Sequence, residues 1–183
     1  QDYADRTRMG ALIEELGIDH LVPGCNDFSY TVCADLNAQF GFSGIDSVEN
    51  TQIINNKEQF RRFALTYAIP VPAVFAVEKA LDFLPVIVKP VDSYSGRGVT
   101  VIRDRNAATL AQAIRAAESQ SRSGQCLVEQ YIEGQLLSHS AFLRGGKILL
   151  DFFVEEQCIA SPFAVDTSKV VTDLSDAIRA RVR

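Results

Sequence analysis

A lysine and a glycine-rich loop between two predicted strands are the residues of this chain best suited to hold a phosphate group. Two β-branched runs, Val86–Val88 and Val99–Ile102, flank the loop, and Lys89 ends the first run with a single cation. Branched side chains suit a pleated, half-buried surface, so the runs predict two antiparallel strands. Pro90 has no amide hydrogen, so regular strand pairing is expected to end there.

The loop itself contains several groups that can donate hydrogen bonds to an anion. These are backbone amides turned inward by glycines, two hydroxyl groups and a second cation, supplied by Gly96, Gly98, Ser93, Ser95 and Arg97. The same residues also fit a plain β-hairpin with a glycine-rich turn and a solvent-exposed lysine, because a glycine loop alone is a weak signal. The elements around the loop must decide between a phosphate site and a simple turn.

The N-terminal part of the chain predicts a helix followed by a β-loop-α unit of an open parallel sheet. Apolar residues at helical spacing predict a helix over residues 2–16, ended by Gly17. A short strand is expected at Ile18–Val22, and a second helix at Phe28–Phe40. The connecting loop, Pro23–Asp27, would lie at the carboxyl end of the strand, where α/β sheets bind ligands, but it fits a structural turn equally well.

The remaining elements alternate between helices and short strands. Asn56 can cap an amphipathic helix, and the clearest helix of the chain spans residues 106–119. Gly145 and Gly146 supply the positive φ angles that the tight turn of a later hairpin requires. Further strands and a final helix are expected at Val74–Val77, Cys126–Ile132, Leu136–Leu143, Ile148–Val154 and Asp176–Arg183. This order predicts a mixed fold of the α/β (α+β) class.

The composition is that of an ordinary globular chain of 183 residues, with 47% apolar residues and a net charge of −5. The basic residues form no cluster, which argues against a nucleic-acid partner or a polybasic membrane patch. No apolar run approaches the roughly 20 residues that span a bilayer, and charged residues interrupt the start of the chain where a signal peptide would lie. Four cysteines and two histidines lack zinc-ligand spacing, so reduced thiols in a cytoplasmic protein are expected.

The order of these motifs resembles the ATP-grasp superfamily of ligases. A helix with Lys57 near its start is followed by Ile-Pro-Val-Pro at 69–72, and then by a strand that ends in Lys89. The Ser/Gly loop comes next, and the segment Val-Glu-Gln-Tyr-Ile-Glu-Gly follows at 128–134. No single motif is decisive, but their occurrence together in this order is fairly specific.

The resemblance implies a partial ATP-grasp fold over residues 46–183, with the core of a nucleotide-binding subdomain at 85–135. Residues 1–45 would form the end of a Rossmann-like pre-ATP-grasp domain. The chain is therefore expected to be a fragment that is truncated at both ends.

The resemblance also implies which residues bind ATP. Lys57 and Lys89 would contact its phosphates, with an exposed position in the first helical turn as the alternative for Lys57. A lid over the triphosphate would comprise Ser93, Ser95, Gly96, Arg97 and Gly98. The adenine-binding hinge would comprise Glu129, Gln130, Tyr131 and Ile132. Glu129 would either orient the purine amine or carry an outward-facing charge, and Tyr131 and Ile132 fit the core as well as a pocket.

The chain departs from the superfamily pattern in two ways. Many members hold the ribose with an acid at the position of Leu136, which leaves Glu133 or Ser138 as substitutes. Magnesium ligands are expected beyond Arg183, so no metal ligand is assigned within the chain. His139 lies between two serines, but neighbours on a strand face opposite ways, so a Ser–His nucleophile pair is not expected.

The implied function is ATP-dependent ligation of a carboxylate to an amine through an acyl phosphate, with this chain supplying part of the ATP site. Such catalysis relies on positioning and charge neutralisation, so no catalytic residue is assigned. The implied ligands are ATP, Mg²⁺ and a carboxylate substrate with an amine or similar acceptor, and the fragment alone is expected to be inactive. The alternatives are a nucleotide-binding module without chemistry and a small-molecule kinase of similar fold. The sequence leaves the substrates and the oligomeric state open.

Overall fold

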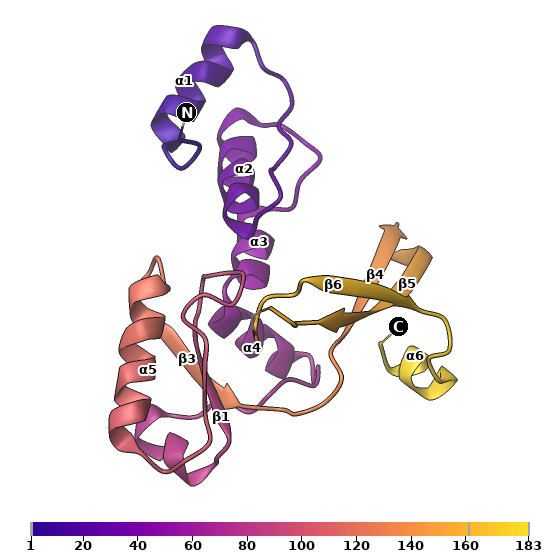
Figure 1. The fold of residues 1–183 in the computed structure, drawn as a ribbon. Coiled ribbons are helices and arrows are strands. Elements are labelled where there is room, and N and C mark those ends of the chain that lie inside the picture. Colours follow the sequence, from indigo (N-terminus) through magenta and orange to yellow (C-terminus); the bar gives the residue numbers. More distant parts are fainter. Residues whose placement is uncertain (1, 161, 183) are drawn as a thin grey trace.

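A string of N-terminal helices leads into two three-stranded antiparallel sheets in the computed structural model, which describes residues 2–160 and 162–182 (Figure 1). The first sheet has the order β2-β1-β3, and the second has the order β4-β5-β6. The mixed helix and sheet architecture confirms the predicted fold class. None of the helices within the described residues is both long and apolar enough to cross a bilayer.

The N-terminal helices confirm two sequence predictions and contradict a third. The helices predicted at 2–16 and 28–40 are present, and each ends at a glycine in the left-handed conformation. The strand predicted at Ile18–Val22 is wrong, because no described segment pairs with it and Val22 is 87% exposed. A β-run becomes a strand only when a neighbour satisfies its backbone groups. The four helices of this part are α1 (Arg6–Leu16), α2 (Asp27–Phe40), α3 (Val48–Asn55) and α4 (Lys57–Thr66).

The first sheet confirms the antiparallel pairing predicted around the glycine-rich loop. Its strands are β1 (Val86–Pro90), β2 (Thr100–Ile102) and β3 (Cys126–Gln130), and Val88 lies opposite both Thr100 and Val128. Helix α5 (Ala107–Gln120) is capped by Asn106 and packs on one face of the sheet. The core between them is formed by Ala80, Val86, Val88, Ile102, Leu110, Ala113, Ala117 and Val128.

The opposite face of this sheet positions the candidate site. Because side chains alternate along a strand, Ile87 and Lys89 point away from α5. Helix α4 lies on that side, and its Arg61 contacts Glu129 of β3. The strand predicted at Val74–Val77 is reduced to a single bridge between Val74 and Glu129, and residues Val77–Asp82 form the 3₁₀-helix η1. Ala73 and Phe75 still exchange backbone hydrogen bonds with β3, through Gln130 and Val128, before the chain enters η1.

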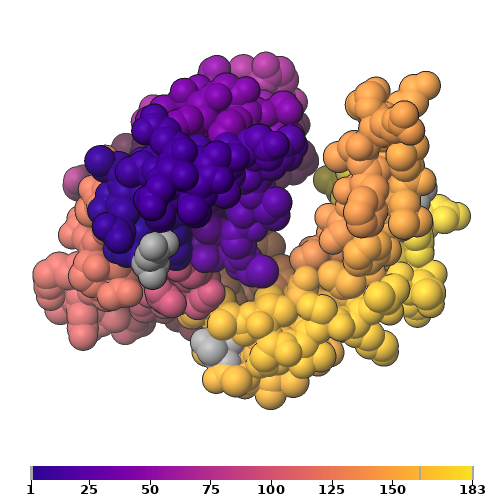
Figure 2. Space-filling model, turned by 90° about the horizontal axis from the view of Figure 1, so that it is seen from above, coloured from indigo at the N-terminus to yellow at the C-terminus, as the bar shows by residue number. Residues whose placement is uncertain are grey.

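The second sheet stands apart from the N-terminal helices. Figure 2 shows its orange and yellow strands as an arm that faces the indigo and purple helices across a hollow. The predicted hairpin is confirmed, with its turn at Gly145 and Gly146 at φ 58° and 73°. The elements are β4 (Leu137–Arg144), β5 (Lys147–Gln157), β6 (Thr167–Val171) and α6 (Asp176–Val182). Strand β6 was not predicted, and residue 183 of the predicted last helix lies outside the described residues.

Candidate functional site

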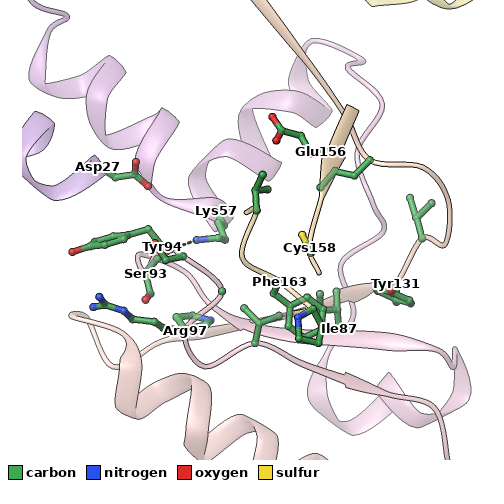
Figure 3. A pocket seen from close by; sticks show the side chains of 18 of the residues that line it. Asp27, Lys57, Ile87, Ser93, Tyr94, Arg97, Tyr131, Glu156, Cys158 and Phe163 are labelled. Atoms are coloured by element: carbon green, nitrogen blue, oxygen red, sulfur yellow. Dashed lines mark hydrogen bonds between the residues drawn. The ribbon is translucent and has the colours of Figure 1, made fainter. Parts of the chain in front are cut away.

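A cleft of about 1220 Å³ lies between the two sheets and is closed on one side by the start of α2. Ile87 of β1 lines it from below and Glu156 of β5 lines it from the other arm (Figure 3), and Val99, directly before β2, is also part of the lining. Its volume exceeds the roughly 300–1,000 Å³ of typical small-molecule pockets. The cleft therefore has space for a nucleotide and a second substrate.

Seven of the predicted site residues line this cleft. The structure brings them together from α4, the glycine-rich loop and the segment after β3: Lys57, Ser93, Ser95, Gly96, Arg97, Tyr131 and Ile132. The side chains come from positions up to 75 residues apart in the numbering of the chain, from 57 to 132. The cleft is thus lined by cations and hydroxyl groups, by apolar side chains, and by the carboxylates of Asp27, Glu133, Glu155 and Glu156.

Lys57 lies at the base of the glycine-rich loop. Asn56 caps α4, so Lys57 occupies the first helical position, and its amide donates a hydrogen bond to the carbonyl oxygen of Val91 over 2.8 Å. Its ammonium donates to the carbonyl oxygen of Ser93 over 2.6 Å (Figure 3). Burial lowers the pKa of Lys57, and the charge of Lys89 lowers it further. A partly desolvated cation whose hydrogen-bond partner is a neutral carbonyl is suited to an anionic ligand.

The glycine-rich loop adopts the left-handed backbone that its glycines permit. Ser95, Gly96 and Gly98 have φ angles of 57°, 69° and 68°. A Cβ atom on Gly96 would lie 2.6 Å from the carbonyl oxygen of Phe163, so this glycine allows the loop to touch the segment after β5. Gly98 instead lies against Gln120 of α5 and Pro90, whose side-chain atoms would be 3.0 to 3.1 Å from an added Cβ atom.

Lys89 belongs to a buried ion triad. Its ammonium forms an ion pair with the carboxylate of Glu129, and Arg61 of α4 binds the same carboxylate at 2.9 and 3.2 Å. The Glu129 side chain is only 2% exposed, and the two cations are 14% and 15% exposed. Burial lowers the pKa of Lys89, although the Glu129 charge opposes that shift. Lys89 thus lies behind the cleft wall with its charge already paired.

The four residues predicted for an adenine-binding hinge lie at the end of β3 and directly after it. Glu129 is buried in the triad, which excludes the expected outward-facing charge. The amide of Gln130 donates to the carbonyl oxygen of Ala73 over 2.8 Å, and that of Tyr131 donates to Pro85 over 3.1 Å. These amides already donate backbone hydrogen bonds because β3 has neighbours along both edges. Of the four residues predicted for the hinge, Tyr131 and Ile132 line the cleft.

Asp92 anchors the glycine-rich loop, although it was not among the predicted site residues. Its carboxylate accepts hydrogen bonds from the Ser121 hydroxyl at 2.7 Å and from the amides of Arg122 and Ser123 at 3.0 and 2.9 Å. Burial alone raises the pKa of Asp92, but the hydrogen bonds from Ser121 and Ser123 outweigh it and hold the pKa below its ordinary value. The sequence did contain a signal for this role. A carboxylate would repel an anionic ligand, so an acid next to a phosphate-binding type of loop favours a structural role for Asp92.

Several cleft residues were not among the predicted site residues. Tyr94 belongs to the loop, and Asp27, Cys158 and Phe163 converge from other parts of the chain (Figure 3). Further lining residues are Cys25, Asn26, Leu136, Glu155, Glu156 and Val165. Within residues 2–160 and 162–182, no three metal-ligating side chains come together. His139 pairs with Asp151 at 2.8 Å on the second sheet.

The fold and the glycine-rich loop together point to one class of protein. The chain matches the family described as the ATP-grasp domain over residues 54–171, and it belongs to that family. It is 26% identical over 145 residues to a formate-dependent phosphoribosylglycinamide formyltransferase of Prochlorococcus marinus, which covers 74% of this chain and 36% of the relative. The chain thus spans about a third of the length of that curated relative.

Two solved structures share the fold. An L-amino acid ligase from Bacillus licheniformis aligns with a TM-score of 0.70 at 16% identity, covering 97% of this chain and 44% of that one. The biotin carboxylase domain of a Hydrogenobacter thermophilus 2-oxoglutarate carboxylase, in complex with MgADP, ADP and bicarbonate, aligns with a TM-score of 0.57 at 21% identity. It covers 74% of this chain and 32% of that one. At these identities the likeness shows the fold alone.

Proposed function

We propose that this chain supplies part of the ATP site of an ATP-dependent carboxylate–amine ligase. The observation that carries the proposal is the position of Lys57, whose half-buried ammonium lies at the base of the glycine-rich loop in the cleft. Membership of the ATP-grasp family and the apolar residues that line the same cleft support it. The remainder of the site and the activity belong to the intact protein.

The cleft residues divide by chemistry into two groups. Lys57, Arg97 and the loop hydroxyls would bind the phosphates, because cations and inward amides stabilise the charge that spreads during phosphoryl transfer. Ile87, Val99 and Ile132 offer apolar surface for the base. Lys89 stays in the proposal as a phosphate contact whose ammonium must leave Glu129 to reach the ligand. Magnesium is expected from the family resemblance, and no step is assigned to it because the described residues do not converge on a metal.

In the proposed reaction, a carboxylate oxygen of the substrate attacks the γ-phosphorus of ATP and releases ADP. The nitrogen of an amine then attacks the acyl phosphate carbon, phosphate leaves with the bonding electron pair, and the amine loses a proton. Positioning and charge neutralisation are the protein's contribution to both steps. The four free cysteines suit a reducing compartment, so we infer that the intact protein works in the cytoplasm.

The test is ATP binding by the intact protein and two lysine variants, measured by calorimetry. Removing one partner of a desolvated charge pair costs about 2–5 kcal/mol. Lys57→Met and Lys89→Met should each weaken ATP binding at least about tenfold. Lys79→Met is the matched control, because Lys79 is exposed on η1 outside the cleft. Unchanged affinity in Lys57→Met would refute the site.

Product analysis separates the three candidate functions. Incubation with ATP and a panel of amino acids should release phosphate and give a new amide if the protein is a ligase. A stable phosphorylated product would identify a kinase, and ATP binding without consumption would identify a binding module. The last two outcomes would contradict the ligase proposal.

A further inference from the structure

Arg122 lies between two parts of the chain that are far apart in sequence. Its guanidinium carbon is 3.9 Å from the ring centroid of Phe28 on α2 and 5.6 Å from that of Tyr94 in the glycine-rich loop. Its Nη1 donates a hydrogen bond to the main-chain oxygen of Asp92 over 3.0 Å. Arg97 approaches the Tyr94 ring as well, at 5.1 Å. One exposed arginine therefore touches the loop and α2 at once.

The loop end of this contact is held firmly. The Asp92 carboxylate is bound by the turn that contains Arg122, and Lys57 binds the next carbonyl, that of Ser93. Arg122 adds the Asp92 main-chain oxygen and the Tyr94 ring to this set. The position of Arg122 therefore sets where the glycine-rich loop starts relative to α5.

The α2 end of the contact reaches the opposite wall of the cleft. Phe28 is the second residue of α2, and the residues directly before it, Asn26 and Asp27, line the cleft. Asn26 caps the helix by accepting a hydrogen bond from the amide of Ser29 over 2.9 Å. A hollow of about 200 Å³ lies beside Arg122 and is lined by Phe28 of α2, Gln59 of α4 and Asp92 of the loop, among others. A shift of Arg122 would therefore change the packing of the Phe28 ring and of the loop together.

We propose that Arg122 is a positioning residue that couples the order of the glycine-rich loop to the start of α2. The inference rests on the proposed nucleotide site, because a phosphate held by the loop is what would reshape the wall at Asn26 and Asp27. The coupling is reciprocal, so a second substrate bound at that wall should raise the affinity for the nucleotide by the same factor as the nucleotide raises the affinity for that substrate. Arginine suits this role because its planar guanidinium stacks on rings while its N–H groups donate, which a lysine cannot match.

The test is hydrogen exchange on the intact protein without nucleotide, comparing wild type with Arg122→Lys. Losing the ring contacts and the Asp92 bond should accelerate exchange about threefold to tenfold. The reporter amides are those of Arg97, Val99, Ser29 and Tyr30. Arg105→Lys is the matched control, because Arg105 is exposed and makes only a 3.5 Å ion pair with Asp82. Equal exchange in wild type and Arg122→Lys would overturn the inference.

A second variant separates coupling from local anchoring. Phe28→Leu leaves the Asp92 bond intact, and it should still accelerate the loop amides of Arg97 and Val99. If only the α2 amides respond, Arg122 does not transmit between the walls and the inference fails. Amides of α5 should keep their wild-type rates in both variants, and acceleration there would mean general destabilisation instead of coupling.

Added ATP gives the readout that a merely structural arginine would not change. In wild type, ATP should slow exchange at Ser29 and Tyr30 as well as in the loop, whereas in Arg122→Lys it should slow the loop alone. If ATP protects no amide in wild type, the proposed function fails, while the nucleotide-free comparison still decides the role of Arg122. If ATP protects both walls equally in wild type and variant, the coupling role is refuted.

Discussion

Replacing Glu129 with glutamine removes the only negative charge from between two buried cations. Its side chain is 2% exposed, and the cations Arg61 and Lys89 are 14% and 15% exposed. Breaking a buried ion pair by removing one partner costs about 3–5 kcal/mol, because an uncompensated charge stays in a poorly solvated place. Glu129→Gln leaves two such charges side by side, so its free energy of unfolding should fall by that amount.

The Lys89→Met variant should be much less damaging. It leaves the Glu129–Arg61 pair with both of its hydrogen bonds, at 2.9 and 3.2 Å, so the buried charges still balance. The lost charge-assisted hydrogen bond, worth about 1.5–3 kcal/mol, is offset in part because a desolvated ammonium disappears. We expect a net loss of about 1 kcal/mol.

Urea unfolding followed by circular dichroism at pH 7 measures both variants. Glu133→Gln is the control, because Glu133 pairs with Arg103 on the surface, where the two side chains are 64% and 60% exposed, and no measurable change is expected. The folded pKa of Lys89 is already lowered by burial, and losing Glu129 should lower it further. In this variant the unfolded chain binds the Lys89 proton more tightly than the folded chain does. The stability lost in Glu129→Gln relative to wild type should therefore shrink as pH rises toward 10.5. A loss in Glu129→Gln no larger than in Lys89→Met would refute this account of the triad.

Three further predictions concern single sites. Folding lowers the pKa of Asp92, so the stability that this carboxylate contributes is complete above pH 3.8 and is lost as pH falls through its folded pKa. In acid titrations, Asp92→Asn should therefore lose less stability than wild type over that pH range. Gly96→Ala should destabilise by about 1–2 kcal/mol in urea, because φ is positive and the new Cβ would meet Phe163. Gly10→Ala within α1 should raise the free energy of unfolding by about 0.5–1 kcal/mol, because alanine favours a helix and its Cβ would lie at an ordinary 3.5 Å from the Phe40 side chain of α2. A lower melting temperature would contradict this.

The sequence by itself determined the local elements around the site. β-Branched runs predicted β1 and β2, Asn56 and Asn106 predicted the starts of α4 and α5, and glycines predicted where α1 and α2 end. These features depend on residues within a few positions of one another, through backbone preference, capping and apolar spacing. The hypothesis that Lys57 and the glycine-rich loop share one site came from the resemblance of the motif order to a family, and both line the cleft.

Only the tertiary structure decided which charged groups meet. Glu129 takes Arg61 as its partner across 68 positions, and Arg122 takes Phe28 across 94. The strand expected at Ile18–Val22 failed for the same reason, because pairing needs a neighbour that its own residues do not specify. Burial of a charge costs several kcal/mol unless a partner arrives, and the partner comes from a distant element. A local pattern fixes the backbone, whereas the packing of distant elements fixes which side chains are buried, paired or left facing the cleft.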